Sequence, residues 1–272
     1  LREMGAEVTV VEVMDALLPL EDHDLGAHLE EVLRESGVEV MVKTAVLDIS
    51  ERGGVKTVST RGGEGEERLE ADMVVVAMGR SPNSENLGLE DLSIAVRDGW
   101  IVVDEHMATN VKGVYAVGDV VGGGLAHVAS AQGLVAAENA LGSKSIYDGR
   151  VVPRCIYTRP QVAAVGLTEK AAREEGLKLK IGRSYMSGNA KASVIGETTG
   201  FAKILAEAST GRVLGVHLMG EYASEVISEA SLAMRLDATV GDIASTIHPY
   251  PTVSEVLREA ALDAEGSFIY NI

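Results

Sequence analysis

The most chemically suggestive stretch of the sequence is residues 247–255, which carry an imidazole, a phenol and a carboxylate close together. His248 and Tyr250 each precede a proline, and a proline lacks an N–H and restricts the residue before it to extended conformations. We therefore expect both side chains to lie on a short, stiff segment outside any helix. Glu255 stands at the start of the helix predicted over the residues that follow. This arrangement is suited to proton transfer.

The same stretch also has a purely structural interpretation. Thr252 and Glu255 have the spacing of a capping box. In that motif the hydroxyl of Thr252 accepts from the N–H of Glu255, and the carboxylate of Glu255 accepts from the N–H of Thr252. Tyr250 would then be packed, and His248 would have its hydrogen bonds satisfied within the fold. Because single motifs have a high false-positive rate, the pattern leaves both interpretations open.

Glu12 is a candidate ligand for a nucleotide ribose, because it ends the β-branched, apolar strand predicted over residues 7–12. In a dinucleotide-binding unit such an acid lies about 20 residues after the phosphate-binding glycines. Only eleven residues precede Glu12, so that glycine loop is expected upstream of Leu1. No arginine follows closely, which favours NAD over NADP. The alternative is an ordinary solvated acid at a strand end.

Asp119 is the second candidate ligand, because the apolar strand predicted over residues 114–117 ends in Gly118 and Asp119. The glycine allows the backbone to approach a ligand, and the carboxylate lies where open α/β sheets bind ligands. A charged acceptor there would bind sugar-alcohol hydroxyls. The N-terminus of the helix predicted over residues 125–141 would face an electron-rich ring or a phosphate. The alternative for Asp119 is a turn aspartate.

The bulk properties limit the possible partners. The 272-residue chain is long enough for one large or two modest domains, and its net charge of −17 argues against nucleic acid and anionic membranes. No apolar run approaches the ~20 residues of a membrane span, and no secretory signal opens the chain. We expect a cytoplasmic protein that begins inside a domain. The single cysteine, Cys155, excludes an intrachain disulfide.

The hydrophobic pattern alternates strands with helices and ends in a mixed α+β region. Helices are predicted at 24–36, 125–141, 224–235 and 252–263. Strands are predicted at 7–12, 38–42, 46–50, 55–60, 67–70, 72–77, 100–103, 161–166, 200–207 and 212–219.

Several motifs, in this order and at these separations, give the chain a resemblance to a known family. It resembles the C-terminal part of the dihydrolipoamide dehydrogenase-like flavoprotein disulfide reductases. The resemblance runs from Leu1 to about Ala264, and residues 267–272 lie beyond it as a predicted tail. The motifs that carry it are residues 9–12, 77–83, 109–120, 157–160 and 251–255.

The resemblance implies an α/β fold class: the remainder of Rossmann-like FAD- and NAD-binding domains, followed by an α+β dimerisation domain. Residues 1–79 would be the rear of the NAD domain, residues 80–148 the returning segment of the FAD domain, and residues 149–272 the interface domain of a homodimer. FAD and NAD are the implied cofactors, and no metal site is expected. The implied cofactor-binding residues are Glu12, Gly79, Gly118, Asp119, Leu125, Ala126 and His127.

The C-terminal segment of one copy would then complete the active site of its partner. Members of the family carry His-x-His-Pro-Thr-x-Ser-Glu, in which the second histidine is the acid–base and the glutamate orients it. Tyr250 stands here at the place of that second histidine, His248 at the first, and Glu255 at the glutamate. A phenol ionises near pH ~10 and an imidazole near ~6.5, so a phenol donates a proton but is a poor base at neutral pH.

The other departure from the family is the missing front. Neither of the family's glycine loops nor its redox-active Cys-x4-Cys is present, and Cys155 alone cannot replace a dithiol pair. We expect the chain to be inactive alone, as a fragment of a longer enzyme or a part of a split one. Its substrate would be a disulfide or dithiol such as dihydrolipoamide. Alternatives are a mercuric reductase-like or other reductase of the same fold, and a non-catalytic dimerisation module.

Overall fold

The structure, a computed structural model, describes residues 1–63 and 65–267. The chain divides into two compact units by its contacts: Leu1–Val74 together with Pro153–Ile272, and Val75–Val152. The domain limits expected from the sequence are close to these boundaries and stay predictions. Apart from Ser267, the predicted tail lies outside the described residues.

Residues 1–74 begin with a βαβ arrangement. Strand β1 (Thr9–Val11) pairs in parallel with β2 (Glu39–Met41), and helix α1 (His23–Glu35) connects them. The carboxylate of Asp22 caps α1 by accepting from the N–H of Asp24 at 3.3 Å. A short 3-10 helix, η1, precedes β1 at Arg2–Met4. The predicted strand–helix–strand order is therefore present, with shorter strands.

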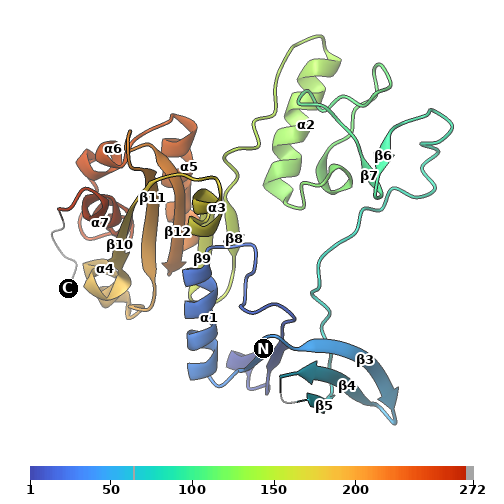
Figure 1. The fold of residues 1–272 in the computed structure, drawn as a ribbon, viewed down its shortest axis with the longest axis horizontal. Coiled ribbons are helices and arrows are strands. Elements are labelled where there is room, and N and C mark those ends of the chain that lie inside the picture. The colour runs from blue at the N-terminus through green and yellow to red at the C-terminus, as the bar shows by residue number, and fades with distance from the viewer. Residues whose placement is uncertain (64, 268–272) are drawn as a thin grey trace. The chain divides into compact units, whose positions relative to one another are not determined.

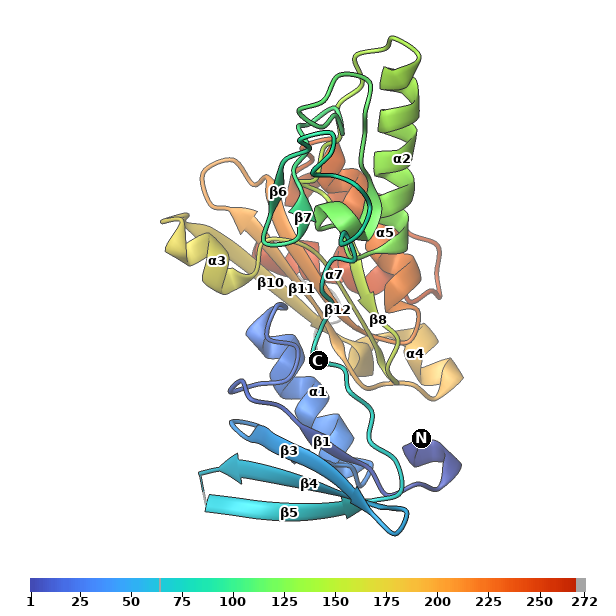
Figure 2. The same cartoon turned by 90° about the vertical axis from the view of Figure 1, so that its right-hand side faces the viewer.

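An antiparallel meander follows β2. It consists of β3 (Ala45–Arg52), β4 (Val55–Gly62) and β5 (Gly65–Ala71), which lie side by side in Figure 2. Gly53 and Gly54, both with positive φ, form the turn between the first two strands. The three short strands predicted here are confirmed, and each is longer than expected.

Two predicted strands are wrong. Residues 72–77 were expected to form a buried strand, but they are irregular and largely exposed, and neighbouring Met78 is 86% exposed. A strand of this apolar type needs neighbours on its edges and helices on its faces. Within the described residues, the parallel sheet holds β1 and β2 alone. The stretch 114–117 likewise forms an isolated bridge, between Ala108 and Tyr115, rather than a strand.

The second unit is built around one helix. Helix α2 (Ala126–Ala140) agrees within a residue at each end with the helix predicted at 125–141. The 3-10 helix η2 (Gly118–Val121) packs against α2 and against β7 (Trp100–Ile101), which forms a short hairpin with β6 (Val96–Arg97). The predicted strand at 100–103 is thus reduced to two residues.

The C-terminal part contains an antiparallel sheet with strand order β10-β11-β12-β9-β8 (Figure 1). Among the helices in the described part of the chain, none has the length and apolar character of a membrane span. The strands are β8 (Arg154–Ile156), β9 (Gln161–Gly166), β10 (Leu179–Tyr185), β11 (Phe201–Glu207) and β12 (Val213–Gly220). The helices are α3 (Glu169–Glu174), α4 (Ala190–Ile195), α5 (Ala223–Arg235), α6 (Val240–Ser245) and α7 (Glu255–Ala264), with the 3-10 helix η3 at Met186–Gly188.

Both faces of this sheet are covered, which explains why β11 and β12 are buried along nearly their whole length. On one face, Phe201 and Met219 pack with Leu25 and Leu29 of α1. Helix α5 packs on β9 and β12, and α7 packs on β10 and β11. Because successive side chains of a strand point to opposite faces, Lys203 shares the α1 face with Phe201.

The packing of α7 on β10 depends on Gly182. A Cβ atom at this position would lie 1.9 Å from the carbonyl oxygen of Ala260 in α7. We expect Gly182→Ala to lower the free energy of unfolding by about 1–3 kcal/mol, measured by urea denaturation, because backbone must move to admit the methyl group. Gly241→Ala in α6 is the matched control, since its Cβ would meet only Thr239 at 3.5 Å. Equal effects of the two changes would contradict the packing argument.

Candidate active site

Tyr250 lies on the segment that connects α6 to α7, between Pro249 and Pro251. Its side chain is 71% exposed, and the peptide bond to Pro251 is cis. The segment is outside any helix, as the two prolines predict. The phenol is therefore presented to the surroundings of this unit rather than packed into its core.

His248, two residues earlier, points the other way, and its side chain is only 4% exposed. Its Nε2 lies 2.9 Å from Glu229 Oε1 on α5, and its Nδ1 lies 3.1 Å from the carbonyl oxygen of Thr246. The hydrogen bond with Glu229 raises the pKa of His248, although burial opposes this. Glu229 was not predicted from the sequence, because a single acidic residue on an amphipathic helix gives no indication of which distant residue it contacts.

The predicted capping box is half present. Glu255 Oε2 accepts from the N–H of Thr252 at 3.1 Å, as expected. The hydroxyl of Thr252 instead donates to the carbonyl oxygen of Pro249 at 2.7 Å and lies 2.8 Å from the hydroxyl of Ser254. Helix α7 starts at Glu255 with Ser254 as its N-cap, so the N–H of Glu255 does not lie in the third helical position that such a cap requires.

Glu255 consequently braces the backbone of the Tyr250 segment from its C-terminal side. The amide of Asn189 adds a second contact by donating to the carbonyl oxygen of Thr252 at 3.0 Å. His248, Tyr250 and Glu255, the three predicted catalytic residues, thus belong to one braced segment. Their catalytic roles stay predictions.

In the second unit, Gly118 and Asp119 lie at the start of η2, beside α2. Gly118 is buried with φ +80°, and its N–H donates to Gln132 Oε1 at 2.7 Å. A Cβ on Gly118 would lie 3.3 Å from that of Ala129, so a larger residue would push η2 away from the helix. The carboxylate of Asp119 is 52% exposed and lies 3.3 Å from Arg80 Nε.

The N-terminus of α2 has the features of an anion- or ring-binding helix end. Leu125 is its N-cap and supplies no side-chain cap, and the first turn contains no acidic residue. Ala126 and His127 in this turn are exposed. A carboxylate that accepts from hydroxyls and a helix end that offers N–H donors thus occur in one compact unit. These residues fit a flavin with a ribityl chain.

Glu12 directly follows β1, at the carboxyl end of the parallel sheet, where a ribose contact is predicted. One oxygen of its carboxylate accepts from the N–H of Met14 at 2.8 Å, which fixes the side chain at the strand end. Gly79 is exposed with φ +107° and belongs to the second unit. The cofactor roles of both residues stay predictions.

A buried ion-pair cluster that was not predicted from the sequence surrounds Lys203. This lysine is 1% exposed, and its Nζ lies 2.8 Å from one oxygen each of Asp22, Asp24 and Glu169. Arg183 also contacts Asp24, at 2.9 Å. Burial lowers the pKa of Lys203, but its three carboxylate partners raise it overall. The sequence feature that could have predicted this cluster is a lysine inside the apolar run of β11.

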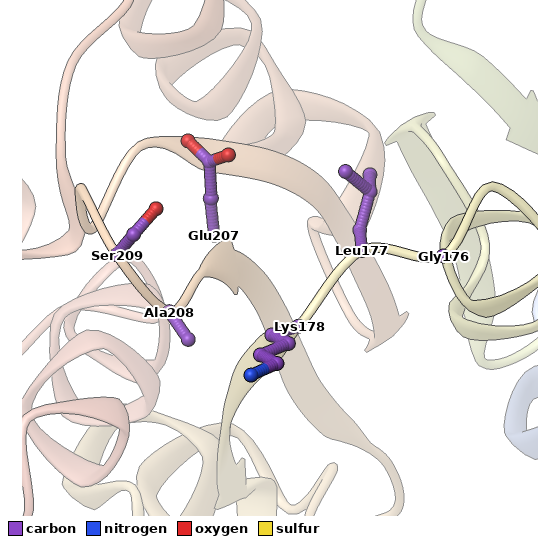
Figure 3. Close-up of a pocket in the computed structure, with 6 residues that line it drawn as sticks. All are labelled: Gly176, Leu177, Lys178, Glu207, Ala208 and Ser209. Atoms are coloured by element: carbon purple, nitrogen blue, oxygen red, sulfur yellow. The ribbon is translucent and has the colours of Figure 1, made fainter.

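Two hollows of the surface lie away from the predicted site residues. One, of about 380 Å³, is formed by two loops beside the end of β11 (Figure 3). Another, of about 430 Å³, lies around Arg159 and Tyr222. Within residues 1–63 and 65–267, no group of three or more His, Cys, Asp or Glu side chains is placed to hold a metal ion. The first hollow is lined by Gly176, Leu177, Lys178, Glu207, Ala208 and Ser209.

The fold is a Rossmann-like portion followed by an α+β domain with an antiparallel sheet, which is the architecture of the nucleotide-binding flavoprotein family that the sequence resembles. The family profiles agree: that of the pyridine nucleotide-disulphide oxidoreductases matches residues 1–133, and that of their dimerisation domain matches residues 152–261. The chain belongs to the pyridine nucleotide-disulphide oxidoreductase family. The predicted family and fold class are confirmed.

The similar curated proteins include dihydrolipoyl dehydrogenases. That of Bacillus subtilis is 40% identical over 99% of this chain and 58% of its own length, and that of Rhizobium etli is 39% identical over 97% and 56%. The chain thus spans less than two thirds of their length. Among solved structures, LpdA of Mycobacterium tuberculosis has a TM-score of 0.87 and is 33% identical, over 96% of this chain and 57% of that chain. A HOCl-induced flavoprotein disulfide reductase of Escherichia coli has a TM-score of 0.86 and is 27% identical, over 96% and 60%.

Proposed function

We propose that the chain is the C-terminal part of an FAD- and NAD-dependent oxidoreductase that passes hydride between NAD(H), flavin and a disulfide or dithiol such as dihydrolipoamide. The observation that carries this proposal is Tyr250, exposed on a segment that is braced on both sides within the matched dimerisation domain. The redox cysteine pair and both glycine loops would lie outside this chain.

Each candidate residue has a defined task in this proposal. Bound flavin and nicotinamide would supply the hydride-transfer chemistry. Asp119 would accept hydrogen bonds from hydroxyls of the flavin side chain, and Glu12 from the ribose of NAD. Tyr250 would donate a proton to the thiolate released when the disulfide is reduced. Glu255 would keep the Tyr250 backbone in place through Thr252.

Association of two copies through residues 149–272 would bring Tyr250 to a partner's active site. The family's dimerisation-domain profile covers most of this range. Large apolar side chains are exposed here, as is expected of a surface that another chain covers. The aliphatic ones are Val194, Leu232, Leu236 and Ile247.

A second candidate is a reductase of the same fold with a different substrate, such as a mercuric reductase-like enzyme. The phenol at position 250 favours it, because a phenol accepts a proton from a dithiol less readily than an imidazole does. The likeness to the HOCl-induced disulfide reductase of Escherichia coli shows that relatives with this architecture are not confined to dihydrolipoyl dehydrogenases.

A fusion tests the proposal. The N-terminal part of the Bacillus subtilis relative, which this chain does not match, would be joined to the chain. NADH-dependent reduction of lipoamide would then be measured on the flavin-loaded dimer. Reduction of lipoamide supports the proposal. A flavin-loaded dimer that reduces other acceptors but no disulfide would favour the second candidate, and one that reduces nothing would favour a non-catalytic dimerisation module.

Asp119→Asn in the same fusion is expected to weaken flavin binding by about 10–100-fold, because a charge-assisted hydrogen bond contributes about 1.5–3 kcal/mol. The measurement is the dissociation constant of FAD, from fluorescence quenching of the free flavin. Asp98→Asn, an exposed aspartate of the same unit, is the matched control and should leave the constant unchanged. A constant unaltered by Asp119→Asn would remove Asp119 from the flavin site.

A further inference from the structure

The contacts of His248 are those of a charged imidazole. Its Nδ1 faces the carbonyl oxygen of Thr246 at 3.1 Å, and its Nε2 faces the carboxylate of Glu229, at 2.9 Å from Oε1 and 3.2 Å from Oε2. A carbonyl and a carboxylate only accept hydrogen bonds. A neutral imidazole donates from one nitrogen, and an imidazolium donates from both. The geometry therefore satisfies both partners only when His248 is protonated.

This imidazolium anchors the segment that carries Tyr250. Within residues 247–250, Ile247 is 94% exposed and Tyr250 is 71% exposed, whereas the His248 side chain is 4% exposed. On the other side of Tyr250, the backbone of Thr252 is held by Glu255 and Asn189. His248 is thus the side chain that ties the N-terminal half of the segment to α5.

We propose that the Glu229–His248 pair is a positioning device that holds Tyr250 in its substrate-facing conformation while His248 is protonated and releases it when His248 loses its proton. The inference rests on the proposed function, since it assigns Tyr250 to the substrate site. It makes His248 and Glu229 positioning residues, because both nitrogens of His248 are engaged and neither is available for proton exchange with a substrate.

The surroundings of His248 fix the direction of this pH dependence. The charged groups that face it are Glu229 on α5 and Arg258 on α7, besides the Thr246 carbonyl. Glu229 raises the pKa of His248, while burial and Arg258 lower it, and the net effect is a rise. A raised folded-state pKa means that the stabilisation is complete below about 6.5, the unfolded value, and is lost as pH rises through the folded pKa.

The test uses the complete 272-residue chain, labelled with 15N-histidine, and follows the ring nitrogens of His248 by NMR between about pH 5 and 9. We expect both nitrogens to be protonated below the transition, a midpoint above the ~6.5 of a free imidazole, and a shift of the Tyr250 ring signals with the same midpoint. Glu229→Gln should lower both midpoints together by about one unit or more. Glu229→Asp, which keeps the charge, should restore much of this shift.

Glu225→Gln is the matched control, because Glu225 is an exposed acid of the same helix. It should leave the His248 midpoint unchanged. The positioning role would be overturned if the Tyr250 signals did not change with the titration of His248. It would also be overturned if the His248 midpoint were the same in the parent chain and in Glu229→Gln. A merely structural pair would leave the pH profile of kcat/KM of the fused enzyme unaltered by Glu229→Gln.

Activity separates this inference from the proposed function. In the fused enzyme, Glu229→Gln should move the alkaline decline of kcat/KM to lower pH by the same amount as the NMR midpoint. If the His248 and Tyr250 signals titrate together but the fusion does not reduce disulfides, the positioning role of the Glu229–His248 pair is supported and the disulfide-reducing function is rejected. An active fusion whose pH profile is unaltered by Glu229→Gln would reject the positioning pair and keep the function.

Discussion

Replacement of Lys203 with methionine is expected to lower the free energy of unfolding by about 3–5 kcal/mol. The change removes the cation and leaves the carboxylates of Asp22, Asp24 and Glu169 to face each other in a largely buried space. Methionine fills a similar volume, so the loss reports the missing charge rather than a cavity. Urea denaturation at pH 7 measures it.

The matched control is Lys170→Met, because Lys170 is exposed and lies 4.0 Å from its partner, Glu174. Exposed pairs contribute about 0–1 kcal/mol, so this change should be close to neutral. A Lys203→Met variant as stable as the Lys170→Met variant would contradict the role of the cluster.

The loss in the free energy of unfolding caused by Lys203→Met should also become smaller as the pH falls. Hydrogen bonds from Lys203 and Arg183 lower the pKa of Asp24 although burial raises it, and the hydrogen bond from Lys203 lowers the pKa of Glu169. Lowered folded-state pKa values give stability that is present above the ordinary values of 3.8 and 4.5 and is lost as pH falls through the folded ones. Without the cation the carboxylates should protonate more readily, so the difference between variant and parent should narrow from pH 7 towards about pH 4.

Tyr250→His in the fused enzyme is expected to raise the rate of dihydrolipoamide oxidation by about 10²–10⁴-fold, the usual contribution of a positioned acid–base. An imidazole takes a proton from a thiol near neutral pH, and a phenol does so poorly. The segment is already braced by His248 and Thr252, so the new ring should occupy the place of the phenol. Steady-state kinetics with dihydrolipoamide and NAD measures the effect.

Tyr157→His is the control for this change, because Tyr157 is another exposed tyrosine of the same unit, outside the segment. It should leave the rate unaltered. If Tyr250→His gives no gain while the flavin and the dimer are retained, position 250 is not the acid–base position, and the alignment of the motif with its relatives fails there.

The sequence by itself determined the elements whose side chains follow a local period. Helices α1 and α2, the β3–β5 meander and strand β9 lie within a few residues of their predicted positions. In α1 the apolar residues recur at helical spacing, and in β9 they form one short apolar run, and both patterns depend on neighbours in the chain alone. The order of the motifs likewise sufficed to identify the family, and the two prolines sufficed to place Tyr250 outside any helix.

Only the tertiary structure decided which distant residues meet. Lys203 pairs with Asp22 and Asp24 because β11 lies in the sheet beneath the start of α1. No local sequence pattern predicts that these two elements meet. The pairing of His248 with Glu229 arises in the same way, between a connecting segment and a helix that precedes it. Residues 72–77 have the composition of a buried strand but do not form one. A strand is stable only where neighbouring strands accept its hydrogen bonds and other elements cover its faces.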